Sequence, residues 1–247
     1  MVNQVYLPCV AVRSGRYPLS IHAGVSVYPV CLNITGRLCI VIGGGAVAER
    51  KVQGLLAGGG RVRVISPEVT GSLAALAEEG RIEWLCKEYS PGDLDDAFLV
   101  FAATDSREVQ EAVCRDAERA AMLINVADDP DHCGFQVPAT VHRGDLTLSV
   151  ATGGRSPAVA AMIRRRLERD FGREYAVLLE LVAMVRERVL SDDSSPRERK
   201  ILFQNILHDD IVAWIREGRW DRLQQHLQEI LGPELRLDLS RLKQDFS

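Results

Sequence analysis

The chain lacks the sequence features of several large protein classes. None of its apolar runs approaches the roughly 20 residues that a membrane-spanning helix needs. Its net charge of −4 carries no basic excess, which argues against a general nucleic-acid binder. The six cysteines form no C-x-x-C pair or regular framework, which favours free thiols in a reducing cytoplasm. The sequence also has no internal repeat and no low-complexity segment.

What the chain does have is a regular alternation of strand-like and helix-like segments between Leu38 and Val126. Strands that alternate with helices of about ten residues or more indicate βαβ units and a parallel sheet. We therefore expect a Rossmann-like, doubly wound α/β sheet with its ligand at the carboxyl ends of the strands. The expected strands are residues 38–42, 61–65, 82–86, 98–102 and 123–126, and the expected helices are residues 46–57, 69–79 and 107–121.

After Asp128 the pattern changes to a short β region and then to helices. Residues 136–141 and 146–151 are β-type runs, and the loop 142–145 between them predicts a hairpin. Ser156 and Pro157 form a typical helix start, and the helix after them has one apolar face. That face comprises Val159, Met162, Ile163 and Leu167, and further helices are expected at residues 177–190 and 197–231, with a polar break at 192–196 and a stop at Gly232-Pro233.

The most informative motif is LCIVIGGGAVAERK, residues 38–51, in which an apolar strand runs into three glycines and a helix. It contains G-x-G-x-x-A, where glycine permits a sharp turn close to a pyrophosphate and the small Ala48 permits tight helix packing. The helix N-terminus offers N–H groups to the phosphates. The motif predicts a dinucleotide site, and the alternative is a tight turn packed for structure. The predicted cofactor-binding residues here are Gly43, Gly44, Gly45, Ala46, Val47 and Ala48.

The end of the second expected strand lacks the acidic residue that usually binds the ribose, and carries Ser66-Pro67 instead. Ser66 can hydrogen-bond the ribose, and Glu68 lies just beyond. Since an acid here would repel a 2′-phosphate, the sequence favours NAD over NADP. Ser66 and Pro67 are therefore further cofactor-binding candidates.

Two more strand ends are expected at the same crevice. The first carries small residues and then Thr104 and Asp105, which are cofactor-binding candidates, although Asp105-Ser106 is also typical of a helix-capping turn. The second carries Asn125 and Asp128. A carboxylate beside a nicotinamide is well placed as a general base, so Asp128 is the catalytic candidate. The alternative for Asp128 is an ordinary loop aspartate.

Two polar segments leave alternatives open. Residues 128–133 contain the residue types that transition metals prefer, but their spacing matches no zinc pattern and acids near Pro130 are ordinary turn chemistry, so no metal site is predicted. Residues 152–156 precede a helix and can hold an anion against its N–H groups. Arg164, Arg165 and Arg166 form either a solvated helix face or contacts to an acidic substrate.

Taken together, these segments resemble the precorrin-2 dehydrogenase family, which comprises the N-terminal half of siroheme synthases and stand-alone relatives. The resemblance covers about residues 28–190. It rests on Tyr28-Pro29 with Leu32, VIGGGAVAERK (41–51), VISPE (64–68), FAATD (101–105), NVADDP (125–130), CGFQVPA (133–139) and ATGGRSPAVA (151–160).

The resemblance implies NAD-dependent oxidation of precorrin-2 to sirohydrochlorin in siroheme and cobalamin biosynthesis. Some relatives also insert ferrous iron as a ferrochelatase, a lyase activity that the sequence leaves open here. The aspartate of the family's N-V-x-D motif is linked to catalysis and falls on Asp128. The resemblance also implies a homodimer with the site in a cleft between domains. The substrate-binding candidates are Asn125, Thr152, Gly153, Arg155 and Ser156, with Thr152 standing where some relatives carry serine.

We therefore expect an extension of unknown role (1–27), an NAD-binding domain (28–135), a β dimerisation region (136–155) and a helical domain (156–247). Because the chain ends at residue 247, we expect a separate uroporphyrinogen methyltransferase to supply precorrin-2. One alternative function is an NAD-sensing module without catalysis, against which Asp128 and the missing ribose acid argue. Another is a porphyrinoid carrier or chelatase that has lost dinucleotide use, against which the intact glycine motif argues.

Overall fold

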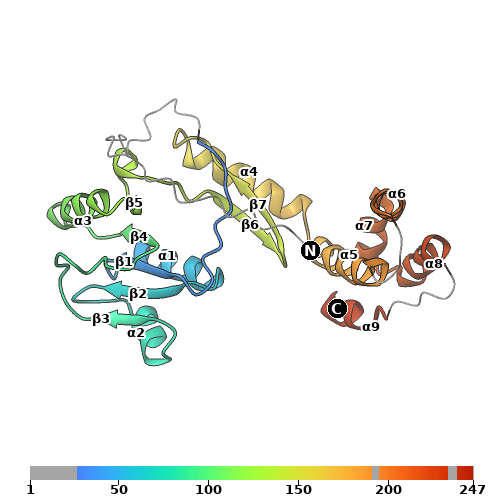
Figure 1. The fold of residues 1–247 in the computed structure, drawn as a ribbon, viewed down its shortest axis with the longest axis horizontal. Coiled ribbons are helices and arrows are strands. Elements are labelled where there is room, and N and C mark those ends of the chain that lie inside the picture. Colours follow the sequence, from blue (N-terminus) through green and yellow to red (C-terminus); the bar gives the residue numbers. More distant parts are fainter. Residues whose placement is uncertain (1–26, 191–194, 233–237, 247) are drawn as a thin grey trace. The chain divides into compact units, whose positions relative to one another are not determined.

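The computed structural model describes residues 27–190, 195–232 and 238–246, so the predicted extension lies almost entirely outside the described residues. The chain divides into two compact units, with the boundary between Val137 and Pro138. The first unit holds a parallel sheet and the second holds a hairpin and helices (Figure 1).

The sheet of the first unit has the strand order β3-β2-β1-β4-β5, and every neighbouring pair is parallel. This order confirms the predicted Rossmann-like, doubly wound fold. The strands after β1 are added first on one side (β2, β3) and then on the other (β4, β5). Folds of this kind bind their ligands at this switch point, in the crevice at the carboxyl ends of β1 and β4. The strands are β1 (Leu38–Ile42), β2 (Arg61–Ile65), β3 (Glu83–Leu85), β4 (Leu99–Ala102) and β5 (Leu123–Val126).

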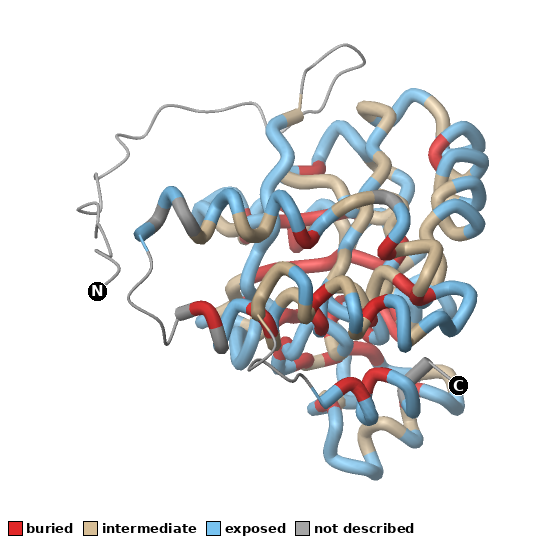
Figure 2. Tube along the Cα trace, turned by 90° about the vertical axis from the view of Figure 1, so that its right-hand side faces the viewer, coloured by how far each residue is buried: buried red, intermediate tan, exposed pale blue. Residues whose placement is uncertain are grey.

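Helices cover both faces of this sheet because successive strand residues point to opposite sides. Val41, Val64 and Phe101 pack in one core with residues of α1 (Ala46–Ala57) and α2 (Gly71–Glu78). Ile40 and Val100 pack on the other face with α3 (Arg107–Arg119). In Figure 2 the buried residues follow the strands of the sheet. All three helices were predicted: α1 has the expected bounds, and the ends of α2 and α3 differ by at most two residues.

The hairpin of the second unit consists of β6 (Ala139–Arg143) and β7 (Leu146–Val150), which pair antiparallel. The predicted four-residue loop is wrong. Arg143 pairs with Leu146, so the turn has only two residues. Gly144 takes the first turn position with φ of 56°, a conformation that glycine adopts without steric cost and that closes a two-residue turn.

Six helices of the second unit follow the hairpin in the described residues. Ser156 caps the first, as predicted, by accepting a hydrogen bond from the Val159 amide. In the second, Val177, Leu181 and Val185 recur at four-residue spacing and are buried in one helical core. The helices are α4 (Pro157–Asp170), α5 (Glu174–Leu190), α6 (Pro196–Ile206), α7 (Asp209–Arg216), α8 (Trp220–Leu231) and α9 (Ser240–Phe246).

Candidate active site

The three glycines of the first unit have different surroundings. A Cβ atom at Gly43 would lie 2.2 Å from the Ala103 carbonyl oxygen, and one at Gly44 would lie 2.0 Å from the Glu68 carbonyl oxygen. Both residues are therefore needed to pack the turn against neighbouring backbone. A Cβ at Gly45 would meet no atom within 4 Å. Gly45 is thus the glycine that faces open space, where a ligand can approach.

The N-terminus of α1 begins at this open glycine. Gly45 is the N-cap and provides no side chain to satisfy the first amides of the helix, and Glu49 is the first helix residue whose N–H bonds back, to the Gly45 carbonyl. Ala46 and Val47 are exposed, whereas Ala48 is buried against the sheet. The turn therefore presents uncapped N–H groups and a partial positive charge, which suits a pyrophosphate.

The turn after β2 is held tightly to the glycine turn. Thr70 donates its N–H to the Gly44 carbonyl over 2.9 Å, and its hydroxyl donates to the Glu49 carboxylate over 2.6 Å. The buried Ser66 hydroxyl donates to the Glu68 carbonyl over 2.6 Å, which leaves its oxygen lone pairs to accept a hydrogen bond from a ribose hydroxyl. Ser66 and the exposed Pro67 thus remain cofactor-binding candidates beside the glycine turn.

The turn after β4 contains both the small residues and the helix cap that the sequence predicted. Ala103 is buried against Gly43, and the Thr104 carbonyl accepts a hydrogen bond from Gln110 over 2.7 Å. Ser106 caps α3 by accepting from the Val109 amide, while Asp105 is exposed. The capping role therefore belongs to Ser106, and the Asp105 carboxylate faces solvent.

Asp128 follows β5 and is exposed, with φ of 60°. This left-handed conformation is uncommon for a residue with a side chain, and aspartate tolerates it better than most. The Ala127 amide donates to the Ala102 carbonyl over 2.8 Å, which fixes the loop to the neighbouring strand end. The strand ends that carry Ala103 and Asp128 are thereby adjacent, as the sequence predicted.

Asn125 lies one step inside β5 and is buried, with both ends of its amide bonded to protein. Its Oδ1 accepts from Lys51 Nζ over 3.1 Å, and its Nδ2 donates to the Phe135 carbonyl over 3.0 Å. The residue is 8% exposed. This environment favours a structural role for Asn125 over direct substrate contact. Sequence reasoning missed Lys51, which lies in the glycine motif but whose partner is 74 residues away.

The loop after Asp128 is a turn built around a buried thiol. Pro130–His132 forms a single turn of 3-10 helix, and His132 Nδ1 lies 2.8 Å from the Asp129 carboxylate. Cys133 Sγ lies 3.2 Å from both the Val126 amide and the Asp129 carbonyl, and burial raises the pKa of this thiol. Within the described residues no group of three or more His, Cys, Asp or Glu side chains is placed to hold a metal ion.

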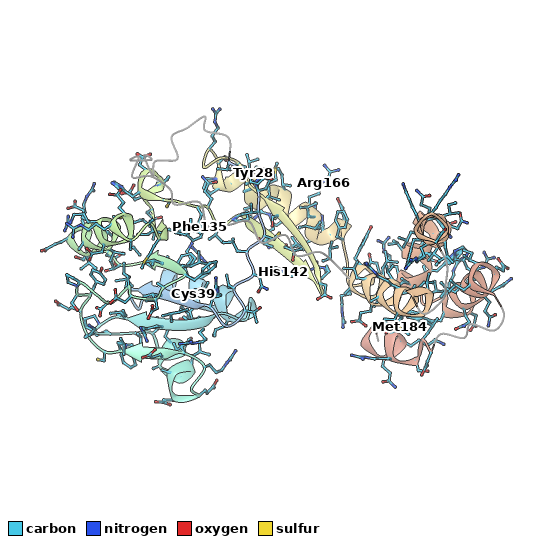
Figure 3. All side chains as sticks on the ribbon, in the orientation of Figure 1. Tyr28, Cys39, Phe135, His142, Arg166 and Met184 are labelled. Atoms are coloured by element: carbon cyan, nitrogen blue, oxygen red, sulfur yellow. The ribbon has the colours of Figure 1, made fainter. Side chains whose placement is uncertain are left out.

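The remaining substrate candidates form a separate loop in the second unit. Thr152 Oγ1 accepts from the Ser156 amide over 3.3 Å, and Gly153 has φ of 59°. The Arg155 side chain is exposed. On α4, Arg164 pairs with Glu168 and Arg166 with Asp170, each one helical turn away, which favours the solvated-face interpretation for these two arginines (Arg166 is labelled in Figure 3).

Comparison with known proteins places these features in a family. Residues 30–139 match a family model described as "Putative NAD(P)-binding", and residues 143–170 match one described as "Sirohaem biosynthesis protein central". The chain is 36% identical over 204 residues to a siroheme synthase of Methylobacillus flagellatus, which covers 83% of this chain and 44% of that protein. It is also 36% identical to a siroheme synthase of Chromobacterium violaceum, over 77% of this chain and 41% of that protein.

The fold is also similar to that of a solved structure. "SirC, precorrin-2 dehydrogenase" is similar with a TM-score of 0.71 and 25% identity, over 83% of this chain and 98% of that chain. This chain belongs to the siroheme synthase and precorrin-2 dehydrogenase family. It spans less than half the length of the siroheme synthases that it matches. None of the helices in the described residues is both long and apolar enough to span a membrane.

Proposed function

We propose that this chain is an NAD-dependent precorrin-2 dehydrogenase, which oxidises precorrin-2 to sirohydrochlorin in siroheme biosynthesis. The observation that carries the proposal is the conjunction of an open Gly45 turn and the carboxylate of Asp128 at the carboxyl ends of β1 and β5. The similarity to siroheme synthases and to "SirC, precorrin-2 dehydrogenase" supports the choice of substrate.

The residues of the first unit fit a dinucleotide. Gly45 and the exposed Ala46 and Val47 leave room for the pyrophosphate against the uncapped amides of α1. Ser66 accepts a ribose hydroxyl, and the exposed Glu68 beside it disfavours a 2′-phosphate. NAD supplies the hydride acceptor when it is bound.

Asp128 is the proposed general base. Aromatising the macrocycle releases a hydride and a proton, and the exposed carboxylate is free to take the proton at an oxygen atom. For the substrate's carboxylates we propose Arg155, Ser156, Thr152 and Gly153, at the N-terminus of α4. Direct contact by Asn125 is the weakest of the proposed substrate assignments, since its amide is occupied.

We also propose a homodimer in which α4 and the predicted dimerisation region, residues 136–155, take part. The predicted apolar face of α4 is exposed in this chain at Val159 (42%), Met162 (57%) and Ile163 (36%). Three neighbouring apolar side chains on one helix face are typical of an interface. Supply of precorrin-2 by a separate uroporphyrinogen methyltransferase and function in the cytoplasm stay predictions.

The test is anaerobic turnover of enzymatically generated precorrin-2 by the purified chain with NAD, following NADH and the sirohydrochlorin spectrum. The proposal predicts both products. NAD binding without NADH formation would instead favour the NAD-sensing module. Ferrous iron added as a substrate afterwards tests the ferrochelatase activity, for which a rate above the enzyme-free control is required.

A further inference from the structure

Lys51 crosses a buried face of the sheet to reach the strand that precedes Asp128. It lies in the second turn of α1, and the register of the sheet aligns Val41, Phe101 and Asn125 in one row. Its ammonium lies 5.2 Å from the centre of the Phe101 ring and 3.1 Å from Asn125 Oδ1. The helix after the glycine turn is thereby tied to the end of β5.

Placing an ammonium group here has a free-energy cost. Burial lowers the pKa of Lys51, as does the neighbouring Arg50, whereas the charges of Cys133 and Asp128 raise it. The aromatic ring and the amide oxygen compensate part of the desolvation. Lys51 is half-buried, and a partly desolvated charge is weak evidence for stability alone. The position therefore calls for another explanation.

The contacts of Asn125 provide one. While its Oδ1 accepts from Lys51, its Nδ2 donates to the Phe135 carbonyl and lies 3.5 Å from Cys133 Sγ. Phe135, labelled in Figure 3, packs edge-on against Phe101 with ring centres 5.4 Å apart. Asn125 stands just before the loop that carries Asp128, and its Nδ2 reaches Phe135 and Cys133 at the other end of that loop. Through its bond to Oδ1, Lys51 holds the Asn125 amide in the orientation that makes these contacts.

We propose that Lys51 is a positioning residue for the dehydrogenation: through Asn125 it fixes the loop that carries Asp128. This inference rests on the proposed role of Asp128 as the base. The other charged or titratable groups near this pair are Arg50 on α1, and Asp129, His132 and Cys133 in the loop itself. Asp129 and His132 are paired with each other, and Lys51 approaches the loop from a different element, α1.

The test compares three variants at one position and its neighbour. Lys51→Met keeps the packing over Phe101 but removes the charge and the hydrogen bond. Lys51→Arg keeps both. Arg50→Met, on an exposed residue of the same helix, makes the same change in net charge without a contact to Asn125. Thermal unfolding of all four proteins shows whether each variant folds.

We expect Lys51→Met to lower kcat by about 10- to 100-fold while the KM for NAD stays near the wild-type value, since small displacements of a catalytic group have effects of this size. Lys51→Arg should recover most of the lost rate, and Arg50→Met should match the wild type. A double variant, Lys51→Met with Asn125→Ala, should lose little more than Lys51→Met alone, because the two residues act as one unit.

A second measurement does not depend on turnover. Amide hydrogen exchange in the Val126–Asp128 segment should be faster in Lys51→Met than in Arg50→Met, since the loop loses an anchor. Unchanged kcat together with unchanged exchange in Lys51→Met would overturn the inference. If exchange rises but Asp128→Asn keeps full activity, the base assignment fails instead, and with it the catalytic part of this inference.

Discussion

At the residue scale, a side chain would have different effects at Gly44 and at the neighbouring Gly45. Gly44 is packed against backbone, so any side chain there forces the turn away from Glu68. Gly45 lies beside open space and has an extended backbone with φ of −82°, which any residue can adopt. The structure therefore separates a glycine needed for folding from one that leaves room for a ligand.

We predict that Gly45→Asp leaves the protein folded but raises the Kd for NAD by at least about 100-fold, because bulk and negative charge would occupy the pyrophosphate position. Gly44→Ala should instead lower the free energy of unfolding by about 2 kcal/mol or more, through overpacking against backbone. Calorimetric NAD titration and urea unfolding measure the two effects. Normal NAD affinity in Gly45→Asp would show that the turn does not hold the dinucleotide.

The sequence predicted the glycine turn but could not distinguish Gly44 from Gly45. That distinction depends on the contact of Gly44 with Glu68, which comes from the turn after β2. The same reason explains why Lys51 was missed, since its partner lies 74 residues away and no spacing rule connects them. Residue types and local motifs are visible in a sequence, whereas the partners of a side chain depend on the tertiary fold.

Thr70 connects three parts of the first unit at the scale of elements. Its hydroxyl accepts from the Leu73 amide as the N-cap of α2 and donates to Glu49 on α1, and its backbone N–H binds the glycine turn. The cap explains why α2 begins at Gly71 and not at the predicted Val69. The five strands of the parallel sheet were predicted to within one residue, because they are short apolar runs bounded by turn residues. The first hairpin strand was predicted at 136–141 and lies at Ala139–Arg143.

We predict that Thr70→Val lowers the free energy of unfolding by about 1–2 kcal/mol, since it removes a helix cap and a hydrogen bond to a carboxylate. Urea unfolding measures the change. Ser72→Ala, at an exposed position of the same helix, is the control and should differ little from the wild type. Equal stability of the two variants would refute the connecting role of Thr70.

An ion pair between α5 and α7 makes the second unit sensitive to acid. Glu174 is 5% exposed, and its Oε1 lies 3.0 Å from Nε and 2.6 Å from Nη2 of Arg216. Burial alone would raise the pKa of Glu174, but the hydrogen bonds and charge of Arg216 outweigh it and lower the pKa. A carboxyl group with a lowered folded-state pKa stabilises the fold above its unfolded value and loses that contribution as pH falls through the folded value.

We therefore predict that the wild type loses stability as pH falls below about 4.3, the ordinary pKa of glutamate. Glu174→Gln should be less stable at neutral pH and show a shallower decline in the acid range. Urea unfolding between neutral pH and the acid range measures this, with Glu180→Gln, an exposed position of α5, as the control. Parallel curves for the wild type and Glu174→Gln would contradict the assignment.

At the scale of the whole molecule, α4 carries an apolar face that stays exposed among the residues that the structure describes. The sequence predicted this face on α4 from its spacing, but spacing cannot tell whether an apolar face packs inside the chain or against a second copy. The exposure of Met162 favours the second copy. The sequence placed a domain boundary between residues 135 and 136, and the two compact units divide between Val137 and Pro138.

We predict that the wild type is a dimer in light scattering coupled to size-exclusion chromatography, and that Met162→Glu shifts it toward the monomer by placing a charge in the apolar contact. Ala75→Glu, an exposed position on α2, makes the same change in net charge and should leave the dimer intact. A monomeric wild type would exclude the proposed homodimer.

The central claim is that the Asp128 carboxylate takes the proton that precorrin-2 loses when its hydride passes to NAD. Its most direct test is the anaerobic production of NADH and sirohydrochlorin by the wild type and by Asp128→Asn. Asparagine suits this comparison because it also tolerates the left-handed backbone at φ of 60°. We predict equal amounts of NADH and sirohydrochlorin from the wild type, and NAD binding with a rate lowered by about 100-fold or more in Asp128→Asn. Undiminished turnover in Asp128→Asn, or no NADH from the wild type, would contradict the account.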